Sequence, residues 1–164
     1  MTAPLQVLRS RTLLTLVVGG TLCLALAPGA SPSGLESPEQ SLVRAINDAR
    51  AAYGAPPLRV DGALQRAARS HSNAILRTGN FTHGNWYWRL RRHGARGRTL
   101  GETIAWVIGA DGTAAAIVRM WLASPPHRQT LLRRGFRRVG VGVAVGGFAG
   151  FSDARVATAD FAGS

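Results

Sequence analysis

The segment that decides the fold is Val139-Gly140-Val141-Gly142-Val143-Ala144, near the C-terminal end of the chain. Valine alternates with glycine or alanine along this segment, and a period of two residues predicts a β-strand. Gly146-Gly147 and Gly150 follow as turn residues, and residues 155–161 are predicted to return as a second strand. The chain is therefore expected to close with an antiparallel hairpin.

Helices are predicted upstream of the hairpin from apolar residues at three- and four-residue spacing and from capping residues. They cover residues 38–53, residues 62–78 after the cap Asp61, a short segment from Asn85 to Arg92, and residues 113–123. Glycines at positions 54, 79 and 94 are predicted to end the first three of these helices. Helices followed by a hairpin favour an α+β architecture.

The inward faces of the longer helices follow from the same spacing. The first helix is predicted to bury Leu42, Val43, Ile46, Ala49 and Tyr53, the second Leu64, Ala67, Ala68, His71 and Ile75, and the fourth Ala116, Ile117, Met120 and Trp121. His71 lies on the inward face of the second helix, so we expect it to be a core histidine whose ring nitrogens are hydrogen-bonded.

The N-terminal segment has the pattern of an export signal. Arg9 and Arg11 precede the apolar run of residues 12–27, and small and turn-forming residues follow. The run is short for a membrane span, which needs about 20 residues. Residues 1–30 are therefore predicted to be a signal peptide, residues 31–38 a linker and residues 39–164 the folded domain. Pro28 disfavours the available cleavage sites, so an uncleaved N-terminal anchor stays open.

The charge of the chain is strongly basic. All 20 of its basic residues are arginine, against 8 acidic residues, and the part after Arg11 keeps 18 arginines and a net charge of +10. Such a surface attracts polyanions, including nucleic acid, anionic lipid heads and wall polymers. No nucleic-acid-binding motif accompanies the arginines, so specific binding of nucleic acid is not expected.

The cysteine content limits the kinds of site that the domain can carry. The single cysteine, Cys23, lies in the N-terminal apolar run. The exported domain therefore has neither a disulfide framework nor a thiolate zinc site.

An ordered series of short motifs covers nearly all of residues 40–162. The motifs are Ile46-Asn47-Asp48-Ala49-Arg50, Pro57-Leu58, Phe81-Thr82-His83, Gly101-Glu102-Thr103-Ile104, Trp121 to Arg128, Val139 to Gly142, and Asp160-Phe161. In this order and spacing they resemble the CAP superfamily (cysteine-rich secretory proteins, antigen 5, pathogenesis-related 1), in a cysteine-free bacterial form. The resemblance implies a three-layer α-β-α sandwich with a central antiparallel sheet.

The resemblance also implies a cavity lined by His83, Glu102, Ser124 and His127. Ser124 stands where the family usually has a second glutamate, and Thr103 replaces the usual asparagine. Two imidazoles and a carboxylate are acceptable zinc ligands, with water in the fourth position. We therefore consider His83, Glu102 and His127 as metal ligands, but assign no catalytic residue, because Ser124 removes a second general acid or base. Structural roles for the same residues, such as a hydrogen bond between His127 and Glu102, stay open.

These features favour a secreted, monomeric, non-enzymatic binding module for a small apolar molecule, such as a lipid or sterol, or for an anionic envelope polymer. The alternative is a metal-assisted, peptidase-like hydrolase that uses His83, Glu102 and His127, with zinc as the metal. A third interpretation is an interaction protein whose basic face contacts the cell envelope. A Ser-His-acid hydrolase is disfavoured because no nucleophile-elbow motif surrounds Ser124. Membrane contact is expected only through an uncleaved N-terminal segment.

Overall fold

A computed structural model describes residues 36–109 and 112–164 of the chain. The chain divides between Ser33 and Gly34 into two units, and every described helix and strand belongs to the second unit. The predicted signal segment, residues 1–30, and most of the predicted linker lie outside the described residues. None of the described helices has the length and apolar character that crossing a bilayer requires.

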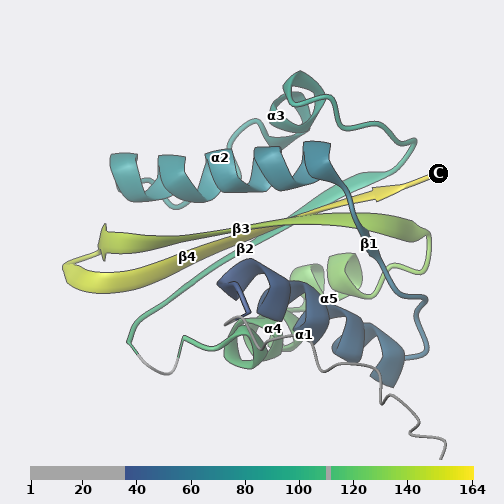
Figure 1. The fold of residues 1–164 in the computed structure, drawn as a ribbon, viewed down its shortest axis with the longest axis horizontal. Coiled ribbons are helices and arrows are strands. Elements are labelled where there is room, and N and C mark those ends of the chain that lie inside the picture. The colour runs from purple at the N-terminus through teal and green to yellow at the C-terminus, as the bar shows by residue number, and fades with distance from the viewer. Residues whose placement is uncertain (1–35, 110–111) are drawn as a thin grey trace, which may run out of the picture. The chain divides into compact units, whose positions relative to one another are not determined.

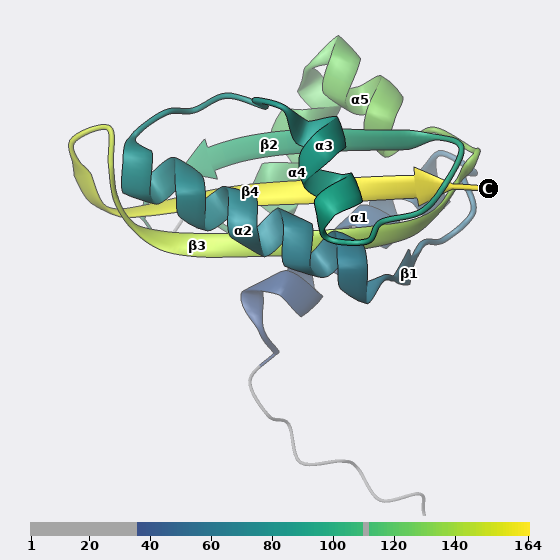
Figure 2. The ribbon, with the colours of Figure 1, turned by 90° about the horizontal axis from the view of Figure 1, so that it is seen from above.

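The described residues form helices in two layers around one sheet (Figures 1 and 2). The helices are α1 (Pro38–Ala52), α2 (Gly62–Thr78), α3 (Trp86–Arg92), α4 (Ala114–Ala123) and α5 (Pro125–Leu131). The strands are β1 (Arg59–Val60), β2 (Leu100–Val107), β3 (Phe136–Phe148) and β4 (Phe151–Gly163). Helices α2 and α3 cover one face of the sheet, and α1, α4 and α5 cover the other. The predicted α+β, three-layer α-β-α architecture is confirmed.

The sheet has the strand order β1-β3-β4-β2. Strands β3 and β4 form the predicted antiparallel hairpin, although both are longer than the predicted segments. Strand β2 extends the sheet antiparallel to β4, and the two-residue β1 pairs parallel to β3. The sheet is therefore antiparallel through its three long strands and mixed at the β1 edge.

The predicted helix ends are confirmed to within one residue. Ser37 and Gln40 form a capping box at the start of α1, and the Asp61 carboxylate accepts hydrogen bonds from two backbone N–H groups at the start of α2. Gly79 ends α2 in the left-handed conformation, with φ of 68°. These caps satisfy backbone groups that a helix end leaves without partners.

Two predicted inward residues are exposed. Tyr53 lies at the end of α1, where Arg128 stacks on its ring, and Met120 of α4 faces outward. The position that α1 buries in place of Tyr53 is Arg50, which donates hydrogen bonds to the backbone carbonyls of Pro56 and Leu131 at 2.9 and 2.6 Å. Burial lowers the pKa of Arg50, and the nearby Arg137 acts in the same direction. Arg50 thus ties α1 to the segment after α5.

The alternating glycines of β3 determine how closely α2 approaches the sheet. A Cβ atom added to Gly140 would lie 2.0 Å from the backbone nitrogen of Gln65, and one added to Gly142 would lie 2.3 Å from that of Arg69. Both contacts are with helix backbone, which cannot rotate away as a flexible side chain can. The valines of the same strand face the opposite way, and Val139 and Val141 enter the core under α1 and α4.

We predict that Gly142→Ala lowers the free energy of unfolding by about 3 kcal/mol, because α2 must move off the strand. In a strand without this steric contact, replacing glycine with alanine would raise the free energy of unfolding by about 0.5–1 kcal/mol. A decrease therefore indicates that the added methyl group clashes with α2. Urea unfolding measures it. Gly135→Ala is the matched control, since an added Cβ there meets nothing within 4 Å. A Gly142→Ala variant as stable as Gly135→Ala would contradict the packing described here.

Candidate functional site

The predicted residues His83 and Glu102 meet at the edge of the sheet formed by β2. His83, in the loop between α2 and α3, lies with Nδ1 2.8 Å from Oε1 of Glu102. The other carboxylate oxygen, Oε2, accepts a hydrogen bond from the guanidinium of Arg89 on α3. Arg89 also donates to the backbone carbonyl of His83 at 3.3 Å. Both carboxylate oxygens of Glu102 are thus engaged by side chains of the chain itself.

We call His83, Arg89 and Glu102, together with Asp160 and His127 described below, the polar cluster. Solvent reaches its side chains to different extents. The side chain of His83 is 43% exposed, whereas that of Glu102 is 1% exposed. A molecule that reaches the cluster from solvent therefore meets the histidine and not the carboxylate.

A second carboxyl group, Asp160 on β4, lies directly across the strands from Glu102. Asp160 is fully buried, and neither of its oxygens has a hydrogen-bond donor among the described residues. Burial raises the pKa of Asp160 well above its ordinary value, and the negative charge of Glu102 acts in the same direction. The raised pKa favours the neutral acid form of Asp160 beside the ion pair of Glu102 and Arg89.

The third predicted residue, His127, approaches from the other layer of the sandwich. It lies on α5, and its ring centroid is 6.1 Å from that of His83. Figure 2 shows α5 beyond the edge of the sheet formed by β2, which allows the two layers to meet there. Burial lowers the pKa of His127, and the proximity of His83 adds to that effect. The structure therefore joins His83 to Glu102 and brings the His127 ring near that of His83.

Ser124 has a different position. It joins α4 to α5, and its backbone donates to Trp121 and accepts from Arg128. Within the described residues, its side chain makes no hydrogen bond to the polar cluster and none as a helix cap. That Ser124 lines a cavity with His83, Glu102 and His127 stays a prediction.

His71 of α2 is buried as predicted, beneath the same cluster. Burial lowers the pKa of His71, against the opposing effect of the Glu102 charge. Its Nε2 has no partner among the described residues, so the expectation of a fully satisfied core histidine is wrong for that atom.

The polar cluster does not fit a zinc ion as it is arranged. The described residues contain no group of three or more His, Cys, Asp or Glu side chains that could hold a metal ion. The physical reason is that Arg89 occupies the carboxylate of Glu102, and its positive charge repels a divalent cation at the same oxygens. No reaction step through a metal follows from this geometry, and the ligation by His83, Glu102 and His127 stays a prediction.

Two members of the polar cluster, Arg89 and Asp160, were not predicted as site residues. Arg89 belongs to a run of arginines, and no local pattern separates it from its exposed neighbours. Asp160 carried a signal that was available, because it is the one acid in the otherwise apolar or uncharged segment of residues 156–161. A charged residue in such a position is expected to be paired or neutral.

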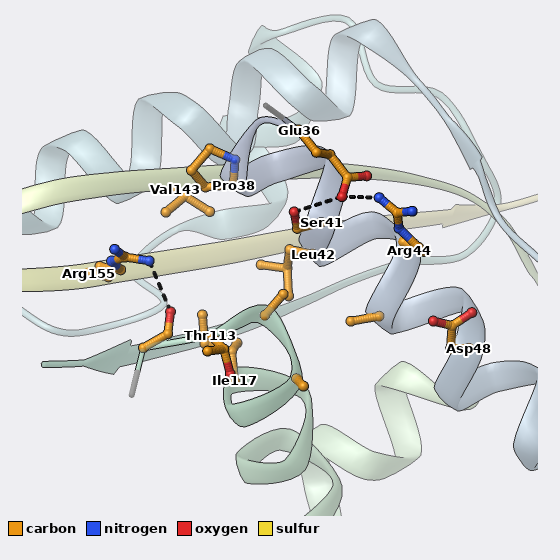
Figure 3. A pocket seen from close by; sticks show the side chains of 14 residues that line it. Glu36, Pro38, Ser41, Leu42, Arg44, Asp48, Thr113, Ile117, Val143 and Arg155 are labelled. Carbon is orange, nitrogen blue, oxygen red and sulfur yellow. Dashed lines mark hydrogen bonds and ion pairs between the residues drawn. The ribbon is translucent and has the colours of Figure 1, made fainter. Parts of the chain in front are cut away.

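A groove lies on the opposite face of the sheet, between α1 and the start of α4 (Figure 3). Its volume is about 490 Å³. The apolar part of its lining consists of Pro38, Leu42 and Ala45 from α1, Ala114, Ala115 and Ile117 from α4, and Val143 from β3. Its rim is polar: Glu36 pairs with Arg44, and Arg155 donates to the Gly112 carbonyl at 3.2 Å. Sequence reasoning did not locate this groove.

We predict that Asp160→Asn changes how stability depends on pH. Because the pKa of Asp160 is raised in the folded state, its stabilising contribution is complete below the pKa of the unfolded chain, about 3.9. The contribution is lost as the pH rises through the folded-state pKa. Asparagine stays neutral, so the stability of the wild type relative to Asp160→Asn should fall as the pH rises.

Urea unfolding of both proteins between about pH 4 and pH 9 measures this difference. Asp153→Asn, which changes an exposed carboxylate of the same strand, serves as the control for the loss of one acidic side chain. A flat or rising difference for Asp160→Asn would show that Asp160 is ionised in the folded protein.

Comparisons with known proteins agree with this fold. Residues 43–161 match the family described as "CAP: Cysteine-rich secretory protein family". The uncharacterized protein YkwD of Bacillus subtilis (strain 168) is 28% identical over 123 residues, which are 72% of this chain and 47% of that protein.

Solved structures of bacterial proteins are also similar. An extracellular protein containing an SCP domain from Bacillus anthracis superposes with a TM-score of 0.64 at 25% identity, covering 77% of this chain and 40% of that one. A cysteine-rich secretory protein from Staphylococcus aureus gives a TM-score of 0.63 at 18% identity, covering 77% and 38%. The chain thus spans less than half the length of these three relatives. Its sequence match and its α-β-α sandwich together show that the chain belongs to the CAP (cysteine-rich secretory protein) family.

Proposed function

We propose that this protein is an exported, non-enzymatic binding module that holds a small apolar molecule, such as a lipid or sterol, in the groove between α1 and α4. The observation that carries the proposal is the apolar wall of that groove, which Ala45, Ala114, Ala115 and Val143 form over the buried side chains of Leu42 and Ile117. Its volume of about 490 Å³ lies within the range of pockets that hold small ligands.

The state of the polar cluster supports a binding role over an enzymatic one. A hydrolase needs a free general base or an activated water. Here the carboxylate of Glu102 is held by His83 and Arg89, and the raised pKa of Asp160 favours its neutral acid form. The metal-assisted alternative gains no support from this arrangement.

Export is part of the proposal. The N-terminal 30 residues have the pattern of a signal peptide. Two proteins of similar structure, from Bacillus anthracis and Staphylococcus aureus, are an extracellular and a secretory protein.

A second candidate ligand is an anionic envelope polymer, and the arrangement of the arginines favours it. Strand pairing and hydrogen bonds place many of them at the end of the sheet near β1: Arg138 lies opposite Arg59 and donates to the Arg96 carbonyl. The exposed arginines around this end are Arg59, Arg96, Arg98, Arg133, Arg134 and Arg137. Among the described residues, its one ion pair joins Arg138 to Asp61. Such an excess of one charge attracts a polyanion.

The proposal predicts that Ala45→Phe, which fills the groove, weakens binding of the neutral apolar probe 1-N-phenylnaphthylamine by at least about tenfold. Fluorescence titration of the chain from Gly34 onward measures it, since this unit contains every described core residue. Ala51→Phe is the matched control, because Ala51 is exposed on the same helix and does not line the groove.

An unchanged affinity in Ala45→Phe, or no binding by the wild type, would rule out the groove. Binding of polyphosphate that salt releases, without probe binding, would instead favour the anionic polymer.

A further inference from the structure

The end of the sheet away from β1 carries an exposed apolar surface, which we call the apolar end. It consists of Phe81, Trp106, Ile108, Met120 and Phe151, which lie around the buried Phe148. Phe81 and Trp106 pack on Phe148 with ring centroids 6.2 and 5.3 Å apart, and Trp106 reaches Phe151 at 6.2 Å. The surface is therefore contiguous.

Four members of the apolar end are far more exposed than a core requires. Phe81, Ile108, Met120 and Phe151 are 39%, 41%, 48% and 43% exposed. A hollow of about 410 Å³ opens among them. Its lining is entirely apolar: Trp106, Val107, Ile108, Ala116, Met120 and Phe151. A contiguous apolar surface of this kind marks an interaction site more often than scattered exposed residues do.

The hairpin turn at this end is built without polar side chains. Figure 1 shows the turn between β3 and β4 reaching past the end of α2. Phe148 and Phe151 pair across the turn, and the two residues between them are Ala149 and Gly150. Ala149 has φ of 51°, a left-handed conformation that asparagine, aspartate and glycine adopt more easily. The turn between β3 and β4 thus has an apolar residue, Ala149, in a backbone conformation that asparagine or aspartate would adopt with less strain.

The rim of the apolar end is basic. Arg77 lies in the last turn of α2, next to Leu76, which packs against the cluster of Trp106 and Phe148. Arg119 precedes Met120 on α4. Both arginines are exposed, and neither forms an ion pair with a described residue. Asp153 is the acidic residue described at this end.

We propose that the apolar end docks on a phospholipid surface with anionic headgroups. A protruding apolar tip enters the boundary between headgroups and acyl chains, where aromatic side chains are stable. The hollow beside Trp106 accepts part of an acyl chain, while Arg77 and Arg119 lie at headgroup level and attract anionic lipid. This contact is separate from the groove between α1 and α4 and needs no N-terminal anchor.

A second copy of the chain fits this surface less well. A symmetric contact through the apolar end would bring Arg77 and Arg119 of both copies together. It would also join two units that each carry a strong net positive charge. A lipid surface instead supplies the opposite charge.

Co-sedimentation with vesicles tests the proposal on the chain from Gly34 onward. We expect binding to vesicles of phosphatidylglycerol and phosphatidylcholine, and weaker binding to phosphatidylcholine alone. The double variant Ile108→Ser/Phe151→Ser should bind at least about tenfold more weakly, because two inserted side chains are lost. Arg77→Gln and Arg119→Gln should each lower binding to the anionic vesicles by about fivefold.

The matched control is Val60→Ser/Trp88→Ser, which removes two exposed apolar residues elsewhere and should leave vesicle binding unchanged. Ala45→Phe should also leave it unchanged, which separates this proposal from the groove. No binding by the wild type, or equal binding by Ile108→Ser/Phe151→Ser, would overturn the proposal. A concentration-dependent dimer that the same double variant abolishes would overturn it in favour of a second copy.

Discussion

The close contact between α2 and β3 at Gly140 and Gly142 is the constraint on which the rest of this structure depends. The helix lies so near the strand that a methyl group on either glycine would overlap helix backbone. At this distance Ser72 of α2 donates a hydrogen bond to the Gly142 carbonyl at 2.9 Å and lies 2.9 Å from the Thr158 hydroxyl on β4. The position of α2 on the sheet is thereby fixed by backbone contact and buried hydrogen bonds together, and not by side-chain packing alone.

The placement of α2 determines what the polar cluster can do. The loop after α2 carries His83, and α3 carries Arg89, so both reach Glu102 at the edge of the sheet. Taking a carboxylate out of water is costly unless it is paired, and here the chain supplies both partners itself. Asp160 adds a second carboxyl group but no second charge, because burial raises its pKa. The Glu102 carboxylate is thus paired within the chain, whereas both Asp160 oxygens and Nε of Arg89 have no partner among the described residues. At this edge of the sheet the two helical layers approach each other through the rings of His83 and His127.

Much of the fold was predictable from local signals, because caps and glycine stops act within a few residues. Asp61, Gly79 and the valine–glycine alternation each identified an element correctly. Strand β2 and helix α5 were not predicted: Leu100–Val107 lacks a two-residue period, and α5 begins with two prolines and has no side-chain cap. In the candidate site, the approach of His83, Glu102 and His127 followed from the resemblance, whereas Arg89 and Asp160 did not. Their roles depend on contacts across the sheet between residues that are far apart or in different layers, which no spacing along the chain encodes.

Glu102 is held by Arg89 and His83, and we propose that the cluster they form is structural. The most direct test is a zinc titration of the chain from Gly34 onward, followed by the NMR signals of the His83 and His127 imidazole rings. We expect no stoichiometric zinc binding by the wild type at micromolar concentrations, and stronger binding by Arg89→Gln, in which the Glu102 carboxylate loses its cation. Tight, stoichiometric binding by the wild type that perturbs both histidines, and that His127→Ala abolishes, would contradict it.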